Sequence, residues 1–166
     1  MGPPPMTETA HQSPVLADET PFDAAAIARV VEDAFGPGRY AKTAERLREG
    51  SEPIAGLVAR TGRQVIGSVR LWPVTVGDVR AAFLGPIAVE ADWRSGRIGA
   101  ALVEACIERA RSMGMSGVLL VGDAPYFGRF GFEAAPLAVL PGPVNQRRVL
   151  WLSLDGSKGE GAVVRG

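Results

Sequence analysis

The clearest hydrophobic pattern in the chain lies between residues 98 and 110, where small and apolar side chains recur at three- and four-residue spacing. This period predicts a helix with one packed face. The packed side comprises Ile98, Ala101, Leu102, Ala105, Cys106, Arg109 and Ala110, and the other side carries Glu104, Glu108 and Arg111. Gly114 follows as a typical C-terminal stop.

An apolar strand is predicted just before that helix, over residues 84–89. Pro86 lies inside this strand. Because proline has no N–H to donate to a sheet ladder, the strand is expected to bulge or to be open on one side there. A polar turn then leads into the helix, so the pattern predicts a strand, a glycine-containing turn and a helix in that order.

Alternating apolar and polar positions predict the rest of a sheet. The predicted strands cover residues 54–60, 64–73, 74–76, 79–89, 117–121 and 149–154. Gly62 lies in the first hairpin turn, and Gly77-Asp78 is a strong signal for the second.

Two helices are predicted before the strands, over residues 23–34 and 42–48, with Asp23 as a cap for the first. They would form either a lid or wall over a substrate site, or packing layers on one sheet face. A short helical turn is predicted at 126–130. This order of elements describes an α/β layered domain on one mixed sheet.

The length of 166 residues suits one domain, which we place at residues 21–155. Residues 1–20 are rich in proline and polar side chains and are expected to form a flexible tail, as are the glycine-rich residues 156–166.

Composition narrows the function classes. Lys plus Arg and Asp plus Glu number 18 each, which gives no sign of a nucleic-acid or anionic-membrane surface. The chain has one cysteine and one histidine, so a disulfide framework, a metal site and a Ser-His-Asp triad are not expected. The absence of an apolar run long enough to span a membrane favours a cytoplasmic protein.

The turn between residues 94 and 97 is the first candidate site. The first-turn amides of a helix have no internal partners, and glycine lets the backbone approach an anion closely. A strand, such a turn and a helix together favour phosphate binding.

Three segments in order resemble the GNAT superfamily of acetyl-CoA-dependent N-acetyltransferases. They are IAVEADWRSGRIGAALV, which resembles the core motif Q/R-x-x-G-x-G/A, GVLLV, and YFGRFGF, which resembles the closing element. The resemblance covers residues 22–154. It implies a central mixed, mostly antiparallel, twisted sheet flanked by helices, with an acyl-CoA cleft between two splayed parallel strands.

The resemblance also implies a set of acetyl-CoA contacts. Ile87, Ala88 and Val89 would bind the pantetheine arm through their backbone. Arg94 stands at the first motif position, and the pyrophosphate loop would comprise Ser95, Gly96, Arg97, Ile98, Gly99 and Ala100.

One loop position departs from the family pattern. The first motif glycine aligns with Arg97, whereas the glycine lies one place earlier, at Gly96. We expect the anion site to persist because backbone amides do the binding, and Arg97 would add positive charge.

Catalytic candidates follow from the chemistry that the family performs. A backbone N–H in the Ala88–Val89 region would stabilise the oxyanion, and a tyrosine would protonate the leaving thiolate. The family's tyrosine position holds Phe127, so Tyr126, one place earlier, is the acid candidate, with aromatic packing as its alternative role. Asp123 is the candidate base, with capping of the Tyr126 turn as its alternative.

Three functions remain open from the sequence. The first is transfer of acetyl from acetyl-CoA to a small-molecule or peptide amine by direct attack in a ternary complex. The second is a non-catalytic acyl-CoA-binding module, and the third an unrelated nucleotide-binding or structural domain. Acceptor recognition is expected from the early helices, the hairpin loops and residues 136–148, which offer Arg39, Tyr40, Arg70, Trp72 and Arg148. An exposed last strand would allow a homodimer.

Overall fold

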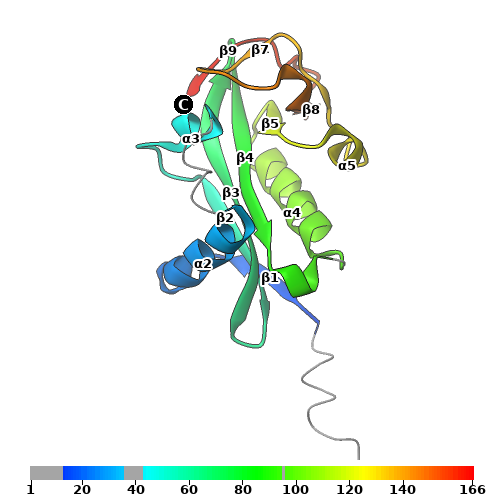
Figure 1. Cartoon of the computed structure of the whole chain (residues 1–166). Helices are drawn as coiled ribbons and strands as arrows, with labels where there is room; N and C mark the ends of the chain where they lie inside the picture. Colours follow the sequence, from blue (N-terminus) through cyan, green and yellow to red (C-terminus); the bar gives the residue numbers. More distant parts are fainter. Residues whose placement is uncertain (1–12, 36–42, 95) are drawn as a thin grey trace, which may run out of the picture.

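A mixed sheet runs through the whole molecule (Figure 1). The structure is a computed structural model that describes residues 13–35, 43–94 and 96–166. Its strands there are β1 (Val15–Asp18), β2 (Ala55–Thr61), β3 (Gln64–Val76), β4 (Val79–Val89), β5 (Gly117–Val121), β6 (Glu133–Ala134), β7 (Ala138–Val139), β8 (Val149–Ser153) and β9 (Gly161–Arg165). The main order is β1-β2-β3-β4-β5-β8-β6, with β9 paired to β3 and β7. The predicted mixed, mostly antiparallel sheet is confirmed.

Strands β4 and β5 are parallel but pair over a short distance only. Their register joins Ala81 to Gly117, Ala82 to Val118 and Phe83 to Leu119. Beyond Phe83, β4 continues to Val89 without pairing to β5. The two strands therefore splay, as the resemblance implied.

Helices cover both faces of the sheet (Figure 1). The α-helices are α2 (Ala24–Phe35), α3 (Thr43–Arg48), α4 (Ile98–Ser112) and α5 (Ala124–Gly128), and the 3₁₀ turns are η1 (Pro21–Asp23), η3 (Ala91–Trp93) and η4 (Gln146–Arg148). Helix α2 packs on Val58, Val65 and Ala88, whereas α4 packs on the alternate residues such as Ala59 and Ile66. Because successive strand residues face opposite sides, α2 and α4 lie on opposite faces.

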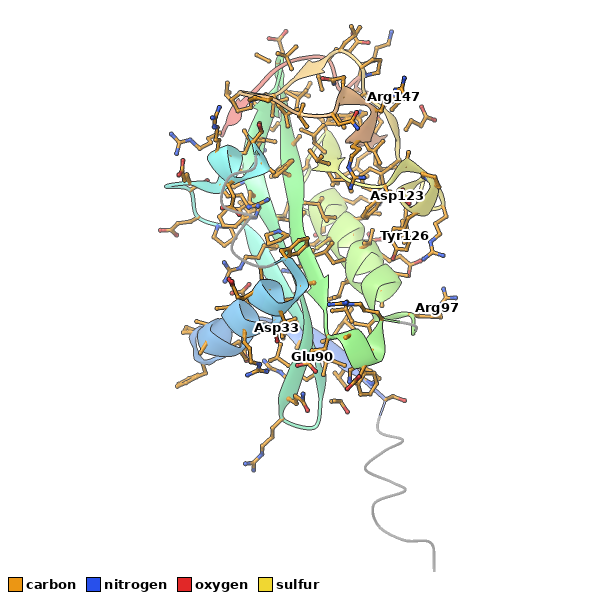
Figure 2. All side chains as sticks on the ribbon, in the orientation of Figure 1. Asp33, Glu90, Arg97, Asp123, Tyr126 and Arg147 are labelled. Carbon is orange, nitrogen blue, oxygen red and sulfur yellow. The ribbon has the colours of Figure 1, made fainter. Side chains whose placement is uncertain are left out.

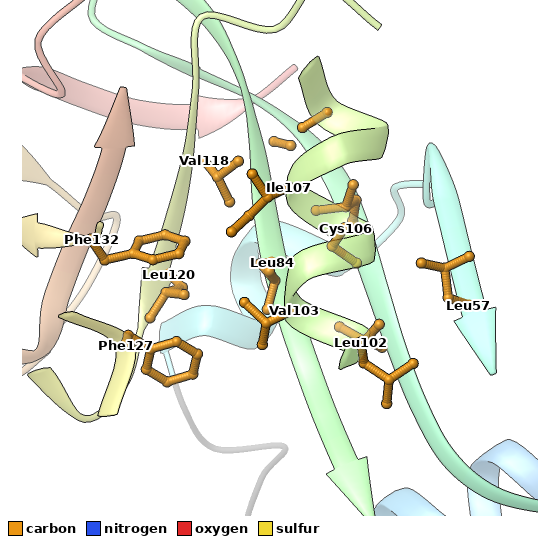
Figure 3. Packing of buried hydrophobic residues seen from close by; sticks show 14 of the residues in the cluster. Leu57, Leu84, Leu102, Val103, Cys106, Ile107, Val118, Leu120, Phe127 and Phe132 are labelled. Carbon is orange, nitrogen blue, oxygen red and sulfur yellow. The ribbon is translucent and has the colours of Figure 1, made fainter. Parts of the chain in front are cut away.

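The buried face of α4 carries the largest part of the core (Figure 3). Leu102, Val103, Cys106 and Ile107 point from this helix toward the sheet. Phe127 from α5 packs with Leu120 in the same cluster. The closing element is thus fixed to the strand that lies across the splay from β4.

The prediction of two strands, at residues 64–73 and 74–76, is wrong, because β3 continues through Pro73 from Gln64 to Val76. Pro73 accepts a hydrogen bond from the N–H of Gly166 at 3.0 Å. The N–H and C=O of one residue face the same neighbour, so the missing donor of Pro73 faces the end of the chain, where β2 has finished pairing. Proline is tolerated at such a position.

The predicted bulge at Pro86 is confirmed. Val69 pairs with Ile87 and Leu71 with Leu84, so Gly85-Pro86 lies opposite a single residue of β3. The indole N–H of Trp72 donates to the carbonyl of Gly85 at 2.5 Å, which holds the bulge in place.

Both predicted tails contain sheet residues, which corrects the domain limits of 21 and 155. Strand β1 pairs with β2, and β9 pairs with the far end of β3. Val163 of β9 is buried. Each strand is short and is stabilised by pairing with a longer neighbour. Its own sequence therefore does not need a strong strand pattern, which is why it was predicted as part of a tail.

Two further predictions need correction. Asp23 does not cap α2, because its carboxylate accepts a bond from the N–H of Thr20 and pairs with Arg60. The strand β8 is not an exposed edge, because β5 lies on one side and β6 covers Leu150 and Trp151 on the other. Because β6 covers much of that edge, β8 offers little free edge for the homodimer contact that the sequence suggested.

Candidate active site

Beyond Phe83, no described strand pairs with the edge of β4 that faces β5. The N–H of Glu90 donates to Ile66 of β3 at 2.8 Å. Backbone groups alternate sides along a strand, so Ala88 also faces β3, while Ile87 and Val89 face the splay. Of the three predicted strand residues, Ile87 and Val89 therefore present N–H groups to the cleft, and Ala88 does not.

The predicted phosphate loop lies at the end of this edge. Helix α4 begins at Ile98, and Arg97 is its N-cap residue without a side-chain capping bond. The N–H groups of Ile98, Gly99 and Ala100 belong to the first turn, where no helical carbonyl precedes them. These three amides have no helical partner and lie where the sequence predicted that an anion would bind.

The rest of the loop differs in detail from the prediction. The N–H of Gly96 donates to the carbonyl of Trp93 at 3.2 Å, so it is engaged within a turn. Ser95 lies outside the described residues. The side chain of Arg97 is exposed and extends outward from the molecule (Figure 2). Arg94 instead turns back, and its Nε donates to the carbonyl of Val89 at 2.8 Å.

Gly99, in the first turn of α4, faces residues of both β4 and α5. A Cβ placed on Gly99 would lie 3.4 Å from Tyr126 Oη and 4.0 Å from Val89 Cγ2. These are ordinary van der Waals separations, so the protein itself does not require glycine here. The space beside Gly99 is a cradle that a side chain would fill.

The closing element places its first two aromatic residues, Tyr126 and Phe127, in different surroundings. Tyr126 is half-buried, with its hydroxyl toward Gly99 and the guanidinium of Arg129 over its ring at 4.3 Å. Phe127 is buried. Because a helical turn rotates side chains by about 100° per residue, only Phe127 lines the cavity described below.

Asp123 caps α5. Its carboxylate accepts a hydrogen bond from the N–H of Tyr126 at 3.1 Å. This is the alternative role that the sequence allowed. The side chain is exposed and lies at the rim of the cavity, so a second role near the reacting groups remains available.

A cavity of about 610 Å³ occupies the space where β4 and β5 splay. Its floor is apolar and includes Phe83, Leu84, Pro86, Ile87, Leu120, Val121 and Phe127. Its outer wall is built by α3 and by residues 143–148. The volume lies within the range of small-molecule sites.

The two parts of the outer wall are tied together by side chains of α3. The hydroxyl of Thr43 donates to the carbonyl of Pro143. A guanidinium N–H of Arg46 donates to the carbonyl of Pro141 at 2.9 Å. Of the roles left open for the early helices, α3 is a wall of the cavity, and α2 is a packing layer whose last residue, Phe35, also lines the cavity.

The sequence did not indicate that arginines of α3 line the cavity. Arg46 and Arg48 line the cavity with Arg148, which had been noted for the acceptor side. The one feature that could have indicated them is the basic last turn of α3, but in a sequence such a turn usually indicates a solvent-exposed surface.

Other predicted acceptor residues lie elsewhere. Arg70 pairs with Glu19 at 2.8 Å, and the indole of Trp72 is bonded to Gly85. Arg39 and Tyr40 lie outside the described residues. Glu90 faces Arg29 at 3.7 Å, away from the splay.

Cys106 is fully buried in the face of α4, and burial raises the pKa of its thiol to about 12. We expect it to resist a thiol-specific reagent in the native protein at neutral pH and to react after unfolding in denaturant. Absorbance of the released chromophore measures both rates. Rapid modification of the native protein would contradict this burial, and slow modification leaves thiol-release assays free of background.

The described residues contain no group of three or more His, Cys, Asp or Glu side chains placed to hold a metal ion. In the same residues, no helix combines the length and the hydrophobicity that a membrane span requires.

Comparison with known proteins gives consistent results. The model of the acetyltransferase (GNAT) family matches residues 24–132. A protein named uncharacterized N-acetyltransferase YhbS, from Escherichia coli K12, is 33% identical over 120 residues, which cover 70% of this chain and 72% of YhbS.

Two crystal structures are similar over nearly the whole chain. The structure of YhbS from Escherichia coli in complex with CoA has a TM-score of 0.78 at 28% identity and covers 92% of this chain and 89% of its own. That of a GNAT family acetyltransferase from Brucella melitensis in complex with acetyl-CoA has a TM-score of 0.74 at 28% identity and covers 94% and 97%.

Proposed function

The chain belongs to the GNAT family of acetyltransferases, and we propose that it transfers an acetyl group from acetyl-CoA to a primary amine by direct attack in a ternary complex. The observation that carries this proposal is the free edge of β4 leading directly to the first-turn amides of α4. A ligand that combines amide groups with phosphates matches this sequence of donors and acceptors. The two similar structures with CoA and acetyl-CoA support the same ligand.

Each part of the site would hold one part of acetyl-CoA. The backbone of Ile87 and Val89 would bond the pantetheine amides, and the amides of Ile98, Gly99 and Ala100 would bind the pyrophosphate. The side chain of Arg94 fixes the carbonyl of Val89 and so holds the strand end beside the helix. Bound acetyl-CoA supplies an activated thioester.

In the reaction, the amine nitrogen forms a bond to the acyl carbon, the carbon–sulfur bond breaks, and the thiolate leaves with a proton. The N–H of Ile87, which is farther along β4 from the start of α4 than Val89, faces the splay and is suited to stabilise the oxyanion, so we assign this role to Ile87 rather than to the Ala88–Val89 region that the resemblance implied. The hydroxyl of Tyr126 is the proton donor that we assign to the leaving sulfur. Asp123 at the cavity rim is suited to receive the proton that the amine loses.

Calorimetric titration with acetyl-CoA and, in parallel, desulfo-CoA tests the binding half of the proposal. We expect saturable binding of both, because the phosphates and pantetheine amides are common to them. Thiol release on addition of amines tests the transfer half. If neither ligand binds at millimolar concentration, the proposal fails.

One observation favours a second candidate, a non-catalytic acyl-CoA-binding module. The residue that reaches the cavity from the closing element is Phe127, which has no proton to donate. In that case acetyl-CoA would bind but no amine would increase thiol release above hydrolysis.

Replacing Tyr126 by Phe tests its role as the acid. We expect kcat to fall by up to about 100-fold, because the leaving thiolate loses its proton donor. Titration with acetyl-CoA separates this loss from any loss of binding at the neighbouring Gly99. A pH profile of kcat measures the effect. Undiminished turnover of Tyr126→Phe at every pH would remove the assignment. Phe127→Tyr is the comparison, since it places a hydroxyl at the cavity instead.

A further inference from the structure

The cavity beside the splay carries more positive than negative charge. Three arginines line it, Arg46, Arg48 and Arg148. Asp123 is the only carboxylate among its described lining residues, and that group already accepts the N–H of Tyr126. The charge of the cavity wall is therefore set by guanidinium groups.

The three arginines differ in whether a nearby carboxylate neutralises their positive charge. Arg48 forms an ion pair with Glu45 at 2.7 Å. Arg46 donates to the neutral carbonyl of Pro141, and in the described part of the chain no carboxylate lies within 4.0 Å of it or of Arg148. Arg46 and Arg148 thus both bring uncompensated charge to the outer wall, one from α3 and one from η4.

We propose that the acceptor amine carries a second, anionic group, a carboxylate or a phosphate, which Arg148 and Arg46 bind at the outer wall. This inference rests on the proposed acetyl transfer and names its substrate class. The apolar floor at Phe83, Leu84 and Phe127 would take the body of the acceptor. Guanidinium groups match the planar, multiple acceptors of carboxylate and phosphate.

The same charges favour the reactive form of the amine. Nearby positive charge lowers the pKa of an ammonium group and so increases the neutral fraction, which is the form that attacks the thioester. Once its anionic group is bound, the acceptor lies with its amine toward Leu84 and Ile87 at the splay. A polycationic acceptor would be repelled by the same wall.

Binding to the CoA-saturated protein tests the inference without requiring turnover. The probes are two matched pairs, L-phenylalanine with L-phenylalaninamide, and O-phosphoethanolamine with ethanolamine. We expect the anionic member of at least one pair to bind at least about tenfold more tightly than its partner, since bonds to charged groups contribute that much. The pair that shows the preference identifies carboxylate or phosphate.

Two neighbouring arginines of η4 provide the matched variants. Arg148→Gln should abolish the preference for the anionic probe, and Arg148→Lys should restore part of it. Arg147→Gln makes the same change in net charge one residue away, at an exposed side chain that does not line the cavity, and should leave the preference intact. The inference is overturned if neither anionic probe binds preferentially at millimolar concentration, or if both Gln variants behave alike.

Thiol release separates this inference from the proposed function. If anionic probes bind selectively but no amine releases thiol, the recognition stands and acetyl transfer fails. If amines are acetylated without preference for the anionic member, acetyl transfer stands and the recognition fails.

Discussion

Gly99→Ala is expected to weaken acetyl-CoA binding by about tenfold or more while the protein remains at least as stable as before. The added Cβ would meet Tyr126 and Val89 at ordinary contact distances, so the fold can accept it. Alanine is also preferred over glycine inside a helix by about 1 kcal/mol. The methyl group would, however, occupy the cradle through which the phosphates approach the first-turn amides.

Calorimetry with acetyl-CoA and thermal unfolding measure the two halves of this prediction. Gly128→Ala is the matched control, because its Cβ would also enter a helix and would meet nothing within 4 Å. Gly96→Ala is the informative comparison. Since the N–H of Gly96 is turned toward Trp93, this variant should bind almost normally. Normal binding by Gly99→Ala would move the phosphate site elsewhere.

The expected behaviour of Gly96 and Gly99 shows where the sequence was sufficient. The start of α4 and its free amides, where we propose that the phosphates bind, could be predicted by local rules, because a helix start depends on few neighbours. The sequence could not assign the shifted glycine, because the N–H of Gly96 is committed to a turn whose geometry depends on η3.

The outer wall of the cavity could not be predicted in the same way. Arg46 and Arg148 lie about a hundred positions apart, and only the docking of α3 on residues 141–143 brings them to one wall. Basic residues on a short helix are usually solvated, so neither carried a local signal. Strand β9 was missed for a similar reason, since its partner β3 lies far away in the sequence.

The role of Asp23 shows how a correct local signal can lead to a wrong assignment. Its position before an amphipathic helix predicted a cap, and Thr20 and Asp23 do bond to each other at the start of η1. The stronger interaction is distant. Both carboxylate oxygens of Asp23 accept bonds from Arg60 of β2, at 2.6 and 2.9 Å. This ion pair joins the residue directly before α2 to β2. It thereby helps to hold α2 against Ala88, on the face of β4 opposite α4.

Asp23→Asn is expected to lower the free energy of unfolding by about 3 kcal/mol at neutral pH, because it leaves Arg60 without its partner in a largely buried position. Urea denaturation measures the change. Asp18→Asn is the control: it removes the Asp18–Arg109 pair, whose aspartate side chain is 66% exposed, and should cost less than about 1 kcal/mol. Equal losses in the two variants would contradict the structural role of Asp23.

The same pair predicts a dependence on pH with a definite sign. The bonds from Arg60, and then that from the N–H of Thr20, hold the pKa of Asp23 well below its ordinary value. A lowered pKa in the folded state gives stability that is fully present above the unfolded pKa, about 4, and is lost as the pH falls further. The difference in unfolding free energy between the wild type and Asp23→Asn should therefore be constant from neutral pH down to about 5 and shrink steadily below about 4. A difference that stayed constant into strong acid would mean that the charge of Asp23 contributes nothing, and that the amide disturbs α2 by its shape alone.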